Sequence, residues 1–490
     1  MKRILSKGLA VVLALAACTG CKSTEGETFH YVNLSQVLCT FLGEENQPLE
    51  ITVKASPADY EVAPGASWLK AEKSEDGKTL TLTVEDNETG AERSTTVTVE
   101  AGQAVQQITV NQLAKDNEFV RYRRLETFQS GAAISPNGKY VGGFVPSIAP
   151  DDSWQYSPTI IDMETGDVYE FGPYPESLIL PTSVSCVTSQ GLMYVVNGQG
   201  DMFAFDMHER NYFIPEVAGY ATIQVNSSSA DGTKWVGRAT GKGETMYVPL
   251  ISENGTVREL PMTELNYRNE PHSMGIIARG ISADGSIAYG TIWDNLDFGM
   301  VYWKDWQNGG QAEYVGKDVH VRKVEKALDS QGLEYDYYCA DGMICQANRT
   351  NISPSGKWIA GSYRTWTLAE NRMDAVTSQV AAFYDVETET TVIVDEYGES
   401  TGTHVTDDGI GFIGLGSLGI SSGRVYDCNT RTDLGTTQEW VYDNYGIIIP
   451  NCYVTSISPD GTVVFGRYLE SSAGGHMKFP GWYVAPPVAE

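Results

Sequence analysis

Aromatic side chains beside acids and amides are the residues of this chain whose types favour ligand binding. They occur in irregular segments, at 144–158, 291–299, 362–379 and 467–480. An aromatic ring stacks against the C–H face of a sugar, while neighbouring carboxylates and amides bind its hydroxyls. We therefore expect ligand contacts from five aromatic residues: Trp154, Tyr156, Trp293, Tyr363 and Trp366. The alternative is that these rings pack over strand ends and exclude water.

Motifs for catalysis are scarce. The six histidines show no His-Glu-x-x-His or His-x-His spacing for a metal ion. The chain also has neither a Gly-x-Ser-x-Gly elbow nor a glycine-rich phosphate loop. We therefore assign no catalytic residue, no metal ligand and no cofactor. A carboxylate pair for glycan hydrolysis remains an alternative, and its candidates are Asp151, Asp152, Asp294 and Asp297.

The first 18 residues have the pattern of an export signal. Three basic residues in "MKRILSK" precede the ten small or apolar residues of "GLAVVLALAA", a run too short to span a bilayer. The run ends in Leu-Ala-Ala-Cys18, which resembles the lipobox of bacterial lipoproteins. That resemblance implies cleavage before Cys18 and acylation of this residue, with Cys21 as a weaker candidate and ordinary secretion as the alternative. Residues 19–29 would then form a linker after the membrane anchor.

The charge balance limits the classes of partner. The chain has 63 acidic and 34 basic residues and a formal charge of −29. Such a surface repels phosphate backbones, so we expect no nucleic-acid partner.

A repeated turn sets the architecture of residues 115–490. "ISPNGKYVGG", "ISADGSIAYG", "ISPSGKWIAG" and "ISPDGTVVFG" each read as a hairpin whose glycine takes the left-handed conformation. A second glycine follows five residues later in six of the seven copies, which indicates close backbone approach. The turn glycines are 53, 41, 53, 71, 53 and 52 residues apart: Gly138, Gly191, Gly232, Gly285, Gly356, Gly409 and Gly461.

Each unit also contains a second hairpin, and two hairpins make one four-stranded propeller blade. The seventh unit ends at "GWYV" (481–484) without a fourth strand, whereas "FVRYRRLETF" (119–128) lacks a hairpin of its own. We therefore predict a seven-bladed β-propeller in which this N-terminal strand completes the last blade and removes an open edge. The hairpins resemble those of TolB-type propellers and depart from the spacing of sialidase Asp-boxes.

Residues 30–114 alternate polar and apolar side chains in short runs, which predicts a small immunoglobulin-like β-sandwich. "GASWLKAE", "TLTLTVEDNETGAERSTTVTVEAG" and "ITVNQ" resemble the BACON domain, a family common in exported Bacteroidetes proteins. The family implies carbohydrate or mucin binding or a spacer role, and we expect a spacer here. The residues that carry the resemblance are Trp68, Asn87, Thr89, Arg93 and Gln112.

Both hairpin turns of a blade should lie at one face, so that the long connections gather at the other. The 71-residue spacing adds the longest excursion, 316–351, in which "VRKVEKALDSQG" suggests a short helix ending at Gly332. Cys339 and Cys345 are close enough in sequence to form a disulfide, and free buried thiols are the alternative.

Together these patterns predict an all-β, outer-membrane lipoprotein, exposed at the cell surface, that binds without catalysis. Its partner would be a glycan or an envelope protein at the connection face of the propeller. The alternative functions are an exported glycan hydrolase or lyase, with its site in the central pocket of the propeller, and a structural role in an envelope assembly.

Overall fold

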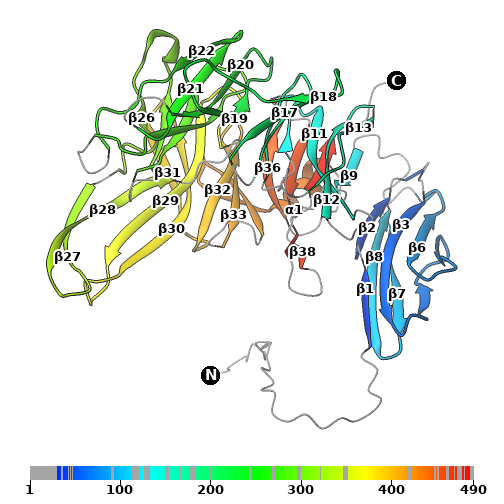
Figure 1. Ribbon diagram of the computed structural model, residues 1–490. Coiled ribbons are helices and arrows are strands. Elements are labelled where there is room, and N and C mark those ends of the chain that lie inside the picture. Colours follow the sequence, from blue (N-terminus) through cyan, green and yellow to red (C-terminus); the bar gives the residue numbers. More distant parts are fainter. Residues whose placement is uncertain are drawn as a thin grey trace, which may run out of the picture. The chain divides into compact units, whose positions relative to one another are not determined.

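The computed structural model describes 30–34, 37–41, 43–44, 46, 48–89, 93–112, 121–125, 133–148, 154–165, 167–175, 183–197, 200–241, 245–266, 271–294, 299–320, 322–345, 351–416, 422–445, 449, 452–459, 463–467, 470–471, 477–478 and 481–485. These residues form an all-β protein whose described part contains one α-helix (Figure 1). The chain divides into two compact units, the first built from residues 1–39, 46–85 and 94–110 and the second from the remainder.

Strands β1–β8 form two four-stranded sheets, with the orders β1-β3-β6-β5 and β2-β8-β7-β4. Side chains alternate between buried and exposed, as period two requires, and the inward ones include Ile51, Leu80 and Val99. The strands are β1 (Tyr31–Leu34), β2 (Leu38–Phe41), β3 (Leu49–Ser56), β4 (Glu61–Pro64), β5 (Leu69–Lys73), β6 (Thr79–Val84), β7 (Arg93–Ala101) and β8 (Ala104–Gln112).

Two polar residues in this region are structural. The buried Asn87 accepts hydrogen bonds from the N–H and hydroxyl of Thr89, at 3.2 and 2.6 Å, which fixes a turn. The Nε of Arg93 donates to the side chain of Gln112 at 2.8 Å and joins β7 to β8. Both contacts agree with the turn and strand-pairing roles that these residue types predict.

The second unit contains seven antiparallel sheets of four or five strands among its described residues. The first three are β10 (Ala133–Ile134), β11 (Tyr140–Ile148), β12 (Trp154–Asp162) and β13 (Val168–Glu170), with β14 (Tyr174–Pro175) beside β12; β15 (Ser183–Val187), β16 (Leu192–Val196), β17 (Met202–Asp206) and β18 (Asn211–Phe213); and β19 (Thr222–Ser228), β20 (Lys234–Thr240), β21 (Val248–Glu253) and β22 (Thr256–Glu259).

The other four sheets continue in chain order. They are β23 (Ile276–Ile281), β24 (Ala288–Ile292), β25 (Met300–Trp303) and β26 (Glu313–Tyr314); β27 (Arg322–Leu328), β28 (Glu334–Cys345), β29 (Trp358–Leu368), β30 (Ala375–Asp385) and β31 (Thr390–Val394); β32 (Ser400–Val405), β33 (Ile410–Leu415), β34 (Gly423–Asp427) and β35 (Thr432–Thr436); and β36 (Tyr453–Ile457), β37 (Val464–Arg467), β40 (Gly481–Ala485) and β9 (Arg121–Leu125). A separate two-stranded sheet of β38 (Glu470–Ser471) and β39 (Met477–Lys478) lies between β37 and β40 in the sequence.

The seventh of these sheets combines both ends of the unit. β9 pairs antiparallel with β40, so that Arg123 stands opposite Tyr483. This is the strand pairing that the unpaired "FVRYRRLETF" predicts.

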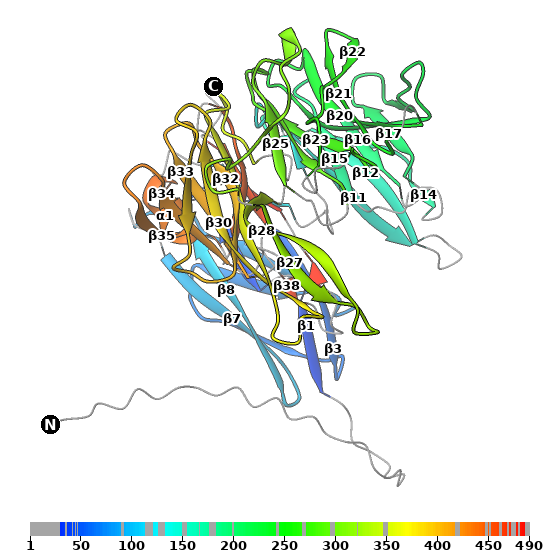
Figure 2. The ribbon, with the colours of Figure 1, turned by 90° about the vertical axis from the view of Figure 1, so that its left-hand side faces the viewer.

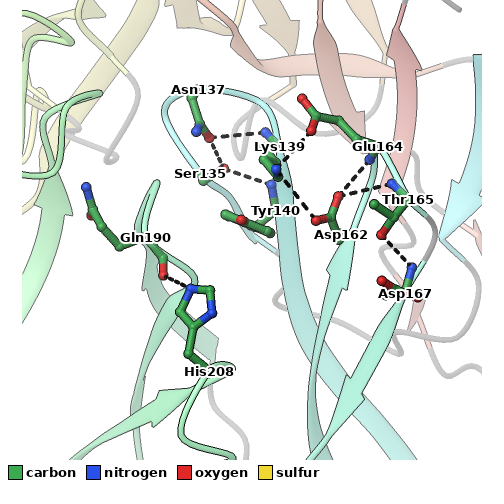
Figure 3. Close-up of polar contacts among 10 residues, drawn as sticks. All are labelled: Ser135, Asn137, Lys139, Tyr140, Asp162, Glu164, Thr165, Asp167, Gln190 and His208. Carbon is green, nitrogen blue, oxygen red and sulfur yellow. Dashed lines mark hydrogen bonds and ion pairs between the residues drawn. The ribbon is translucent and has the colours of Figure 1, made fainter. Parts of the chain in front are cut away.

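In the first, third and fourth copies the repeated turn is held by a serine and an Asp or Asn two residues later. Figure 3 shows the first copy, where the hydroxyl of Ser135 donates to Asn137 at 2.6 Å and accepts the N–H of Tyr140 at 2.9 Å. Asn137 also accepts the N–H of Lys139 at 3.1 Å, and Gly138 has a φ of +74°. Equivalent bonds recur around Asp231 and Asp284. These hydrogen bonds close the first hairpin of a sheet, which explains why the sequence repeats the turn.

In the third and fourth repeats the second glycine lies where backbones approach closely, as predicted. A Cβ at Gly237 would stand 1.8 Å from the carbonyl oxygen of Gln224, and one at Gly290 would stand 2.4 Å from that of Ile277. Any other residue would push these paired strands apart.

Polar side chains tie neighbouring sheets together, three from the first strands β15, β19 and β32 and one, Asn351, from the segment before β29. Each donates to a backbone carbonyl of the next sheet, and three of the donors sit at β-bulges. The bonds are Ser185 to Val225 at 2.7 Å, Asn226 to Ala278 at 2.7 Å, Asn351 to Gly402 at 3.0 Å and Thr403 to Val454 at 2.7 Å.

Apolar cores join each sheet to the next in chain order. One further core joins the last sheet to the first, through Phe465 and Val463 on one side and Val141 and Met163 on the other. The remaining cores are represented by Phe144 with Val187, Ala204 with Val225, Val236 with Ala278, Tyr302 with Ile359, Phe383 with Ile413, and Phe412 with Val464.

The predicted helix before Gly332 is wrong. Residues 322–328 form β27, which pairs with β28 across a turn at 329–333. Val321, Val324 and Leu328 do have a helical spacing, but the segment pairs with β28 along its whole length, so strand pairing overrides the local pattern.

The described α-helix, α1 (Thr437–Tyr445), lies between the sixth and seventh sheets, where Val441 packs into their core. A capping box starts it: the N–H of Thr436 donates to Glu439 at 2.7 Å, and the N–H of Glu439 donates back to the Thr436 hydroxyl at 3.1 Å. A short 3₁₀-helix spans Trp306–Asn308. No helix in the described part of the chain is long and apolar enough to cross a membrane.

Candidate ligand-binding face

Both turns of a sheet lie at the same end of its strands, which we call the turn end. In the first sheet the N–H of Met163, in the second turn, donates to the carbonyl of Lys139, in the first, at 2.8 Å. The same contact joins Asn254 to Thr233 and Val386 to Lys357, each at 2.8 Å. The segment between the second and third strands of each sheet therefore lies at the opposite, connection end, as predicted.

Three short segments meet at the connection end of the third and fourth sheets, and we call them the Trp293 strip: 245–247, 273–275 and 293–294. The N–H of Tyr247 donates to the carbonyl of Met274 at 2.8 Å, and the N–H of Trp293 donates to that of Gly275 at 2.9 Å. Gly275 permits this contact, because a Cβ there would lie 2.1 Å from the carbonyl oxygen of Tyr247. The backbone of Trp293 is thereby fixed to both sheets.

The side chain of Asp294 holds two segments of the same strip together by hydrogen bonds. Its side chain is 2% exposed, and one oxygen accepts the N–H of Met274 at 2.6 Å and that of Ser273 at 3.1 Å. The other oxygen lies 2.5 Å from Nδ1 of His272, whose side chain is 4% exposed. Nε2 of His272 lies 2.8 Å from the hydroxyl of Thr263. Burial by itself would raise the pKa of Asp294, but these hydrogen bonds hold the pKa below its ordinary value.

Two arginine–aromatic pairs accompany the strip. The guanidinium carbon of Arg279 lies 5.5 Å from the centre of the Trp293 ring, and that of Arg238 lies 4.3 Å from the Tyr247 ring. Burial lowers the pKa of Arg238. The side chain of Trp293 is 37% exposed and that of neighbouring Met246 is 50% exposed. The strip thus presents an anchored aromatic surface with cations beside it, a combination suited to stacking on a planar or cyclic ligand.

The other predicted aromatic residues lie on the first and fifth sheets and have less open surroundings. Tyr156 is half-buried in β12 and packs against the core between the first two sheets. Tyr363 packs against the core between the fourth and fifth sheets. Trp366 is half-buried, with Arg364 5.6 Å from its ring. Trp154 begins β12, but its side chain lies outside the described part of the structure.

The segments that carry these residues are more regular than the sequence predicts. Instead of long irregular loops, 144–158 and 362–379 consist mainly of the extended ends of β11, β12, β29 and β30. Tyr156 and Trp366 therefore stand on paired strands, where alternation fixes the face that each occupies.

Of the four acidic residues named for hydrolysis, only Asp294 lies among the described residues. Its low pKa and its occupied oxygens are the opposite of what a general acid needs. Asp151, Asp152 and Asp297 lie outside the described residues. Within the described part of the chain, no group of three or more His, Cys, Asp or Glu side chains lies close enough together to hold a metal ion.

Cysteines add no redox site that the structure describes. Cys345 is buried with a free thiol, and burial raises its pKa to about 11. The side chain of Cys339 and the anchor candidate Cys18 lie outside the described residues.

His272, Thr263 and Arg279 support the strip from outside its three segments, and sequence reasoning did not single them out. His272 and Asp294 are 22 residues apart and meet because His272 precedes β23 and Asp294 follows β24, two strands that pair in the fourth sheet. Arg279 had a readable signal: like Ser185, Asn226 and Thr403, it stands six residues before a turn glycine.

Comparison with protein families gives a match for the N-terminal region. Residues 58–113 match the BACON family, described as "Putative binding domain, N-terminal". This region is therefore similar to the BACON family, the resemblance expected for residues 30–114. No curated protein matches the chain.

Solved structures give two partial likenesses. A xyloglucanase of family GH5 from Bacteroides ovatus, in complex with a XXXG heptasaccharide, is 22% identical over 25% of this chain, with a TM-score of 0.15. The chain spans 29% of the length of that enzyme. The β-propeller domain of the Trilobed protease from Pyrococcus furiosus, described as having an open velcro topology, is 9% identical over 82% of this chain and 93% of its own, with a TM-score of 0.33.

Proposed function

We propose that this protein is a lipid-anchored binding protein that recognises a glycan at the Trp293 strip without catalysing a reaction. The observation that supports this proposal is the state of Trp293 itself. It is the most exposed of the predicted aromatic residues whose side chains are described, and its backbone is fixed between two sheets. A rigid platform loses little conformational entropy when a ligand binds.

Binding is favoured over hydrolysis because the acid beside Trp293 is already engaged. Both oxygens of Asp294 are engaged by His272 and backbone N–H groups, so this carboxylate stabilises the conformation of the strip. The BACON domain agrees with a binding role for the whole chain. In our proposal it holds the second unit away from the membrane as a spacer.

We further propose that the second unit is a seven-bladed β-propeller completed by β9, and that β1–β8 form an immunoglobulin-like sandwich. The support for the propeller is the cyclic order of the cores, in which Phe465 of the last sheet packs with Val141 of the first. A ring of sheets would gather the connections of every sheet at one face. The Trp293 strip would then lie at that face.

The binding test is a glycan array probed with the purified full chain in detergent, beside Trp293→Ala and Phe213→Ala. Phe213 is a matched control because it is also exposed, on β18 of another sheet. We expect Trp293→Ala to weaken the bound signal by about tenfold or more and Phe213→Ala to leave it unchanged. Absence of binding by the folded wild type, or equal binding by Trp293→Ala, would contradict the proposal.

We also propose that the protein belongs to an exported Bacteroidetes lipoprotein class, with Cys18 as the acylated residue and display at the surface of the outer membrane. The support is the signal-like run that ends in Leu-Ala-Ala-Cys. Cys18→Ala should move the protein from the membrane fraction to the soluble fraction, whereas Cys21→Ala should not. An unchanged membrane fraction for Cys18→Ala would refute the anchor.

A further inference from the structure

The fifth sheet extends into an arm that its neighbours lack. The β-arm consists of β27 and β28 together with the outer halves of β29 and β30, residues 322–345 and 365–378. β28 pairs with β29 at its base, where Asp341 stands opposite Thr365. Figures 1 and 2 show β27 and β28 running out beside β30, away from the shorter strands of the neighbouring sheet.

Arg372 joins the two hairpins of the β-arm near their turns. Its carbonyl accepts the N–H of Leu328 at 2.8 Å, and its Nε donates to the carbonyl of Lys326 at 2.8 Å. Its guanidinium also pairs with Glu334 at 2.6 Å. The turn between β27 and β28 therefore lies against the turn between β29 and β30. We call the end that they form the arm tip, residues 328–336 and 369–376.

The arm tip has a concentration of exposed apolar side chains. Leu333 and Met373 are 61% and 51% exposed, and each adjoins one partner of the ion pair between Glu334 and Arg372 in the sequence. By contrast, the described outer strands β22, β26 and β31 expose no large apolar side chain. Such a concentration marks an interaction surface. Its large apolar residues, each 45–61% exposed, are Leu333, Tyr335, Met373 and Val376.

The β-arm as a whole is acidic. It contains four basic and seven acidic residues, for a net charge of 4 − 7 = −3. Two of the basic residues are already used within the arm, because Lys326 pairs with Asp336 and Arg372 pairs with Glu334. The negative charge in excess is therefore available to cations from outside the arm.

Exposed carboxylates lie beside the apolar side chains of the arm tip. Glu370 and Asp374 are both exposed, on either side of Met373 in the sequence. A second copy that docked arm to arm would place −3 against −3, and an anionic membrane surface would repel the arm in the same way. A basic partner would instead find complementary charge next to an apolar surface.

From these observations we propose that the arm tip binds a basic segment of a partner protein that also has apolar side chains. Leu333 and Met373 would bury apolar surface against this segment, and Glu370 and Asp374 would select its positive charge. This docking site is separate from the Trp293 strip and does not depend on glycan binding there.

The first test measures the binding of three fluorescein-labelled peptides to the full chain in zwitterionic lipid nanodiscs by fluorescence anisotropy. The basic, apolar probe is Lys-Leu-Lys-Val-Lys-Leu-Lys. The controls are Glu-Leu-Glu-Val-Glu-Leu-Glu, which reverses the charge, and Lys-Ser-Lys-Ser-Lys-Ser-Lys, which removes the apolar side chains. We expect the probe to bind at least about tenfold more tightly than either control. Equal binding of the probe and either control, or no binding of the probe, would overturn the proposal.

A Leu333→Ser, Met373→Ser variant places the site on the arm tip. It removes two exposed apolar side chains and should weaken probe binding by about tenfold or more. Phe213→Ser, Ile214→Ser is the matched control, because these residues are 44% and 57% exposed beside another sheet. This control should retain the affinity of the wild type. Equal affinity of the two variants for the probe would refute the arm tip as the site.

A Glu370→Gln, Asp374→Asn variant tests the selection of charge. It removes two negative charges with little change in side-chain size, and it should weaken probe binding by about threefold or more. Glu209→Gln, Glu216→Gln removes the same charge from exposed positions beside the second sheet and should retain the affinity. Equal losses in the two variants would mean that the probe responds only to net charge, which contradicts the proposal.

Other occupants of the arm tip would be recognised with the same apolar variant. A wild-type dimer in sedimentation velocity that Leu333→Ser, Met373→Ser dissociates would identify a second copy as the occupant. Binding of the Cys18→Ala chain to phosphatidylcholine vesicles that the same two substitutions abolish would identify a lipid surface. Either result would overturn the proposal of a basic protein partner.

Discussion

At the residue scale, His272 and Asp294 show how a pair of titratable residues can stabilise a conformation instead of taking part in a reaction. Asp294 accepts two backbone N–H groups and faces His272, so its charge is used within the protein. Since Trp293 is the adjacent residue, this network sets the position of the proposed ligand platform. Loss of the carboxylate should therefore affect stability and binding together.

Asp294→Ala leaves the buried N–H groups of Ser273 and Met274 without their acceptor, which should cost about 1–3 kcal/mol of unfolding free energy at pH 7. The folded-state pKa of Asp294 lies below its ordinary value. Its contribution is therefore complete above the unfolded pKa of about 3.9 and is lost as the pH falls through the lower, folded-state pKa.

Urea unfolding of wild type and Asp294→Ala from pH 7 down to pH 3 measures this difference. Asp167→Ala is the control, because Asp167 is exposed on a turn of the first sheet. A stability difference that stays constant, or that grows as the pH falls, would contradict the assigned role.

At the element scale, β9 is the strand whose partner lies farthest away in sequence. It pairs with β40 across about the whole length of the second unit, and Tyr122 stands opposite Val484. A pairing of this separation forms at a high cost in loop-closure entropy. Its presence argues that the edge of the last sheet would otherwise be open.

A Tyr122→Pro, Arg123→Pro variant should break the β9–β40 ladder, because at least one of two consecutive N–H groups faces β40. We expect a loss of at least about 1–3 kcal/mol in unfolding free energy by guanidinium titration. Ser330→Pro is the matched control, since Ser330 is the second residue of an exposed turn that tolerates proline. Equal stability of the two variants would argue against closure by β9.

At the scale of the whole molecule, the seam between the first and last sheets decides whether the sheets form a ring. Phe465 is buried there with Val141, Met163 and Val463. A ring has no terminal sheet, so each core should contribute comparably to one cooperative unit. In an open array of sheets, separating the first sheet from the last would cost little unfolding free energy.

Phe465→Ala should therefore cost about 3–5 kcal/mol, which is similar to Phe412→Ala in the core between the sixth and seventh sheets. Chemical denaturation of the two variants makes the comparison. A cost near zero for Phe465→Ala alone would mean that the seam is open in solution.

Much of the fold could be predicted from the sequence, because the residue patterns that specify its turns are local. Ser135, Asn137 and Gly138 close a turn by contacts that span five residues, and the same contacts recur wherever the motif recurs. The capping box of Thr436 and Glu439 was equally readable, although the sequence analysis did not use it. The helix predicted before Gly332 is wrong because pairing with β28 outweighs the helical spacing of Val324 and Leu328.

The candidate site was predicted less well, because exposure is not a local property. Trp293 and Tyr363 look alike in sequence, each beside charged or polar residues at the end of a strand. Packing distinguishes them: Tyr363 meets the core of the fifth sheet, whereas Trp293 stands where two connections meet. His272 entered the site only through a contact between segments 22 residues apart.

The sequence by itself determined the number of repeats, the turn that closes each first hairpin, the glycines at close strand contacts and the need for a distant strand to pair with residues 481–485. Each of these follows from backbone conformation or from period-two burial, which depend on neighbours a few residues away. Only the tertiary structure decided that Asp294 is a structural anchor, that Trp293 remains exposed and that residues 322–328 form a strand. Those properties depend on which segments lie against one another, and no short stretch of sequence carries that information.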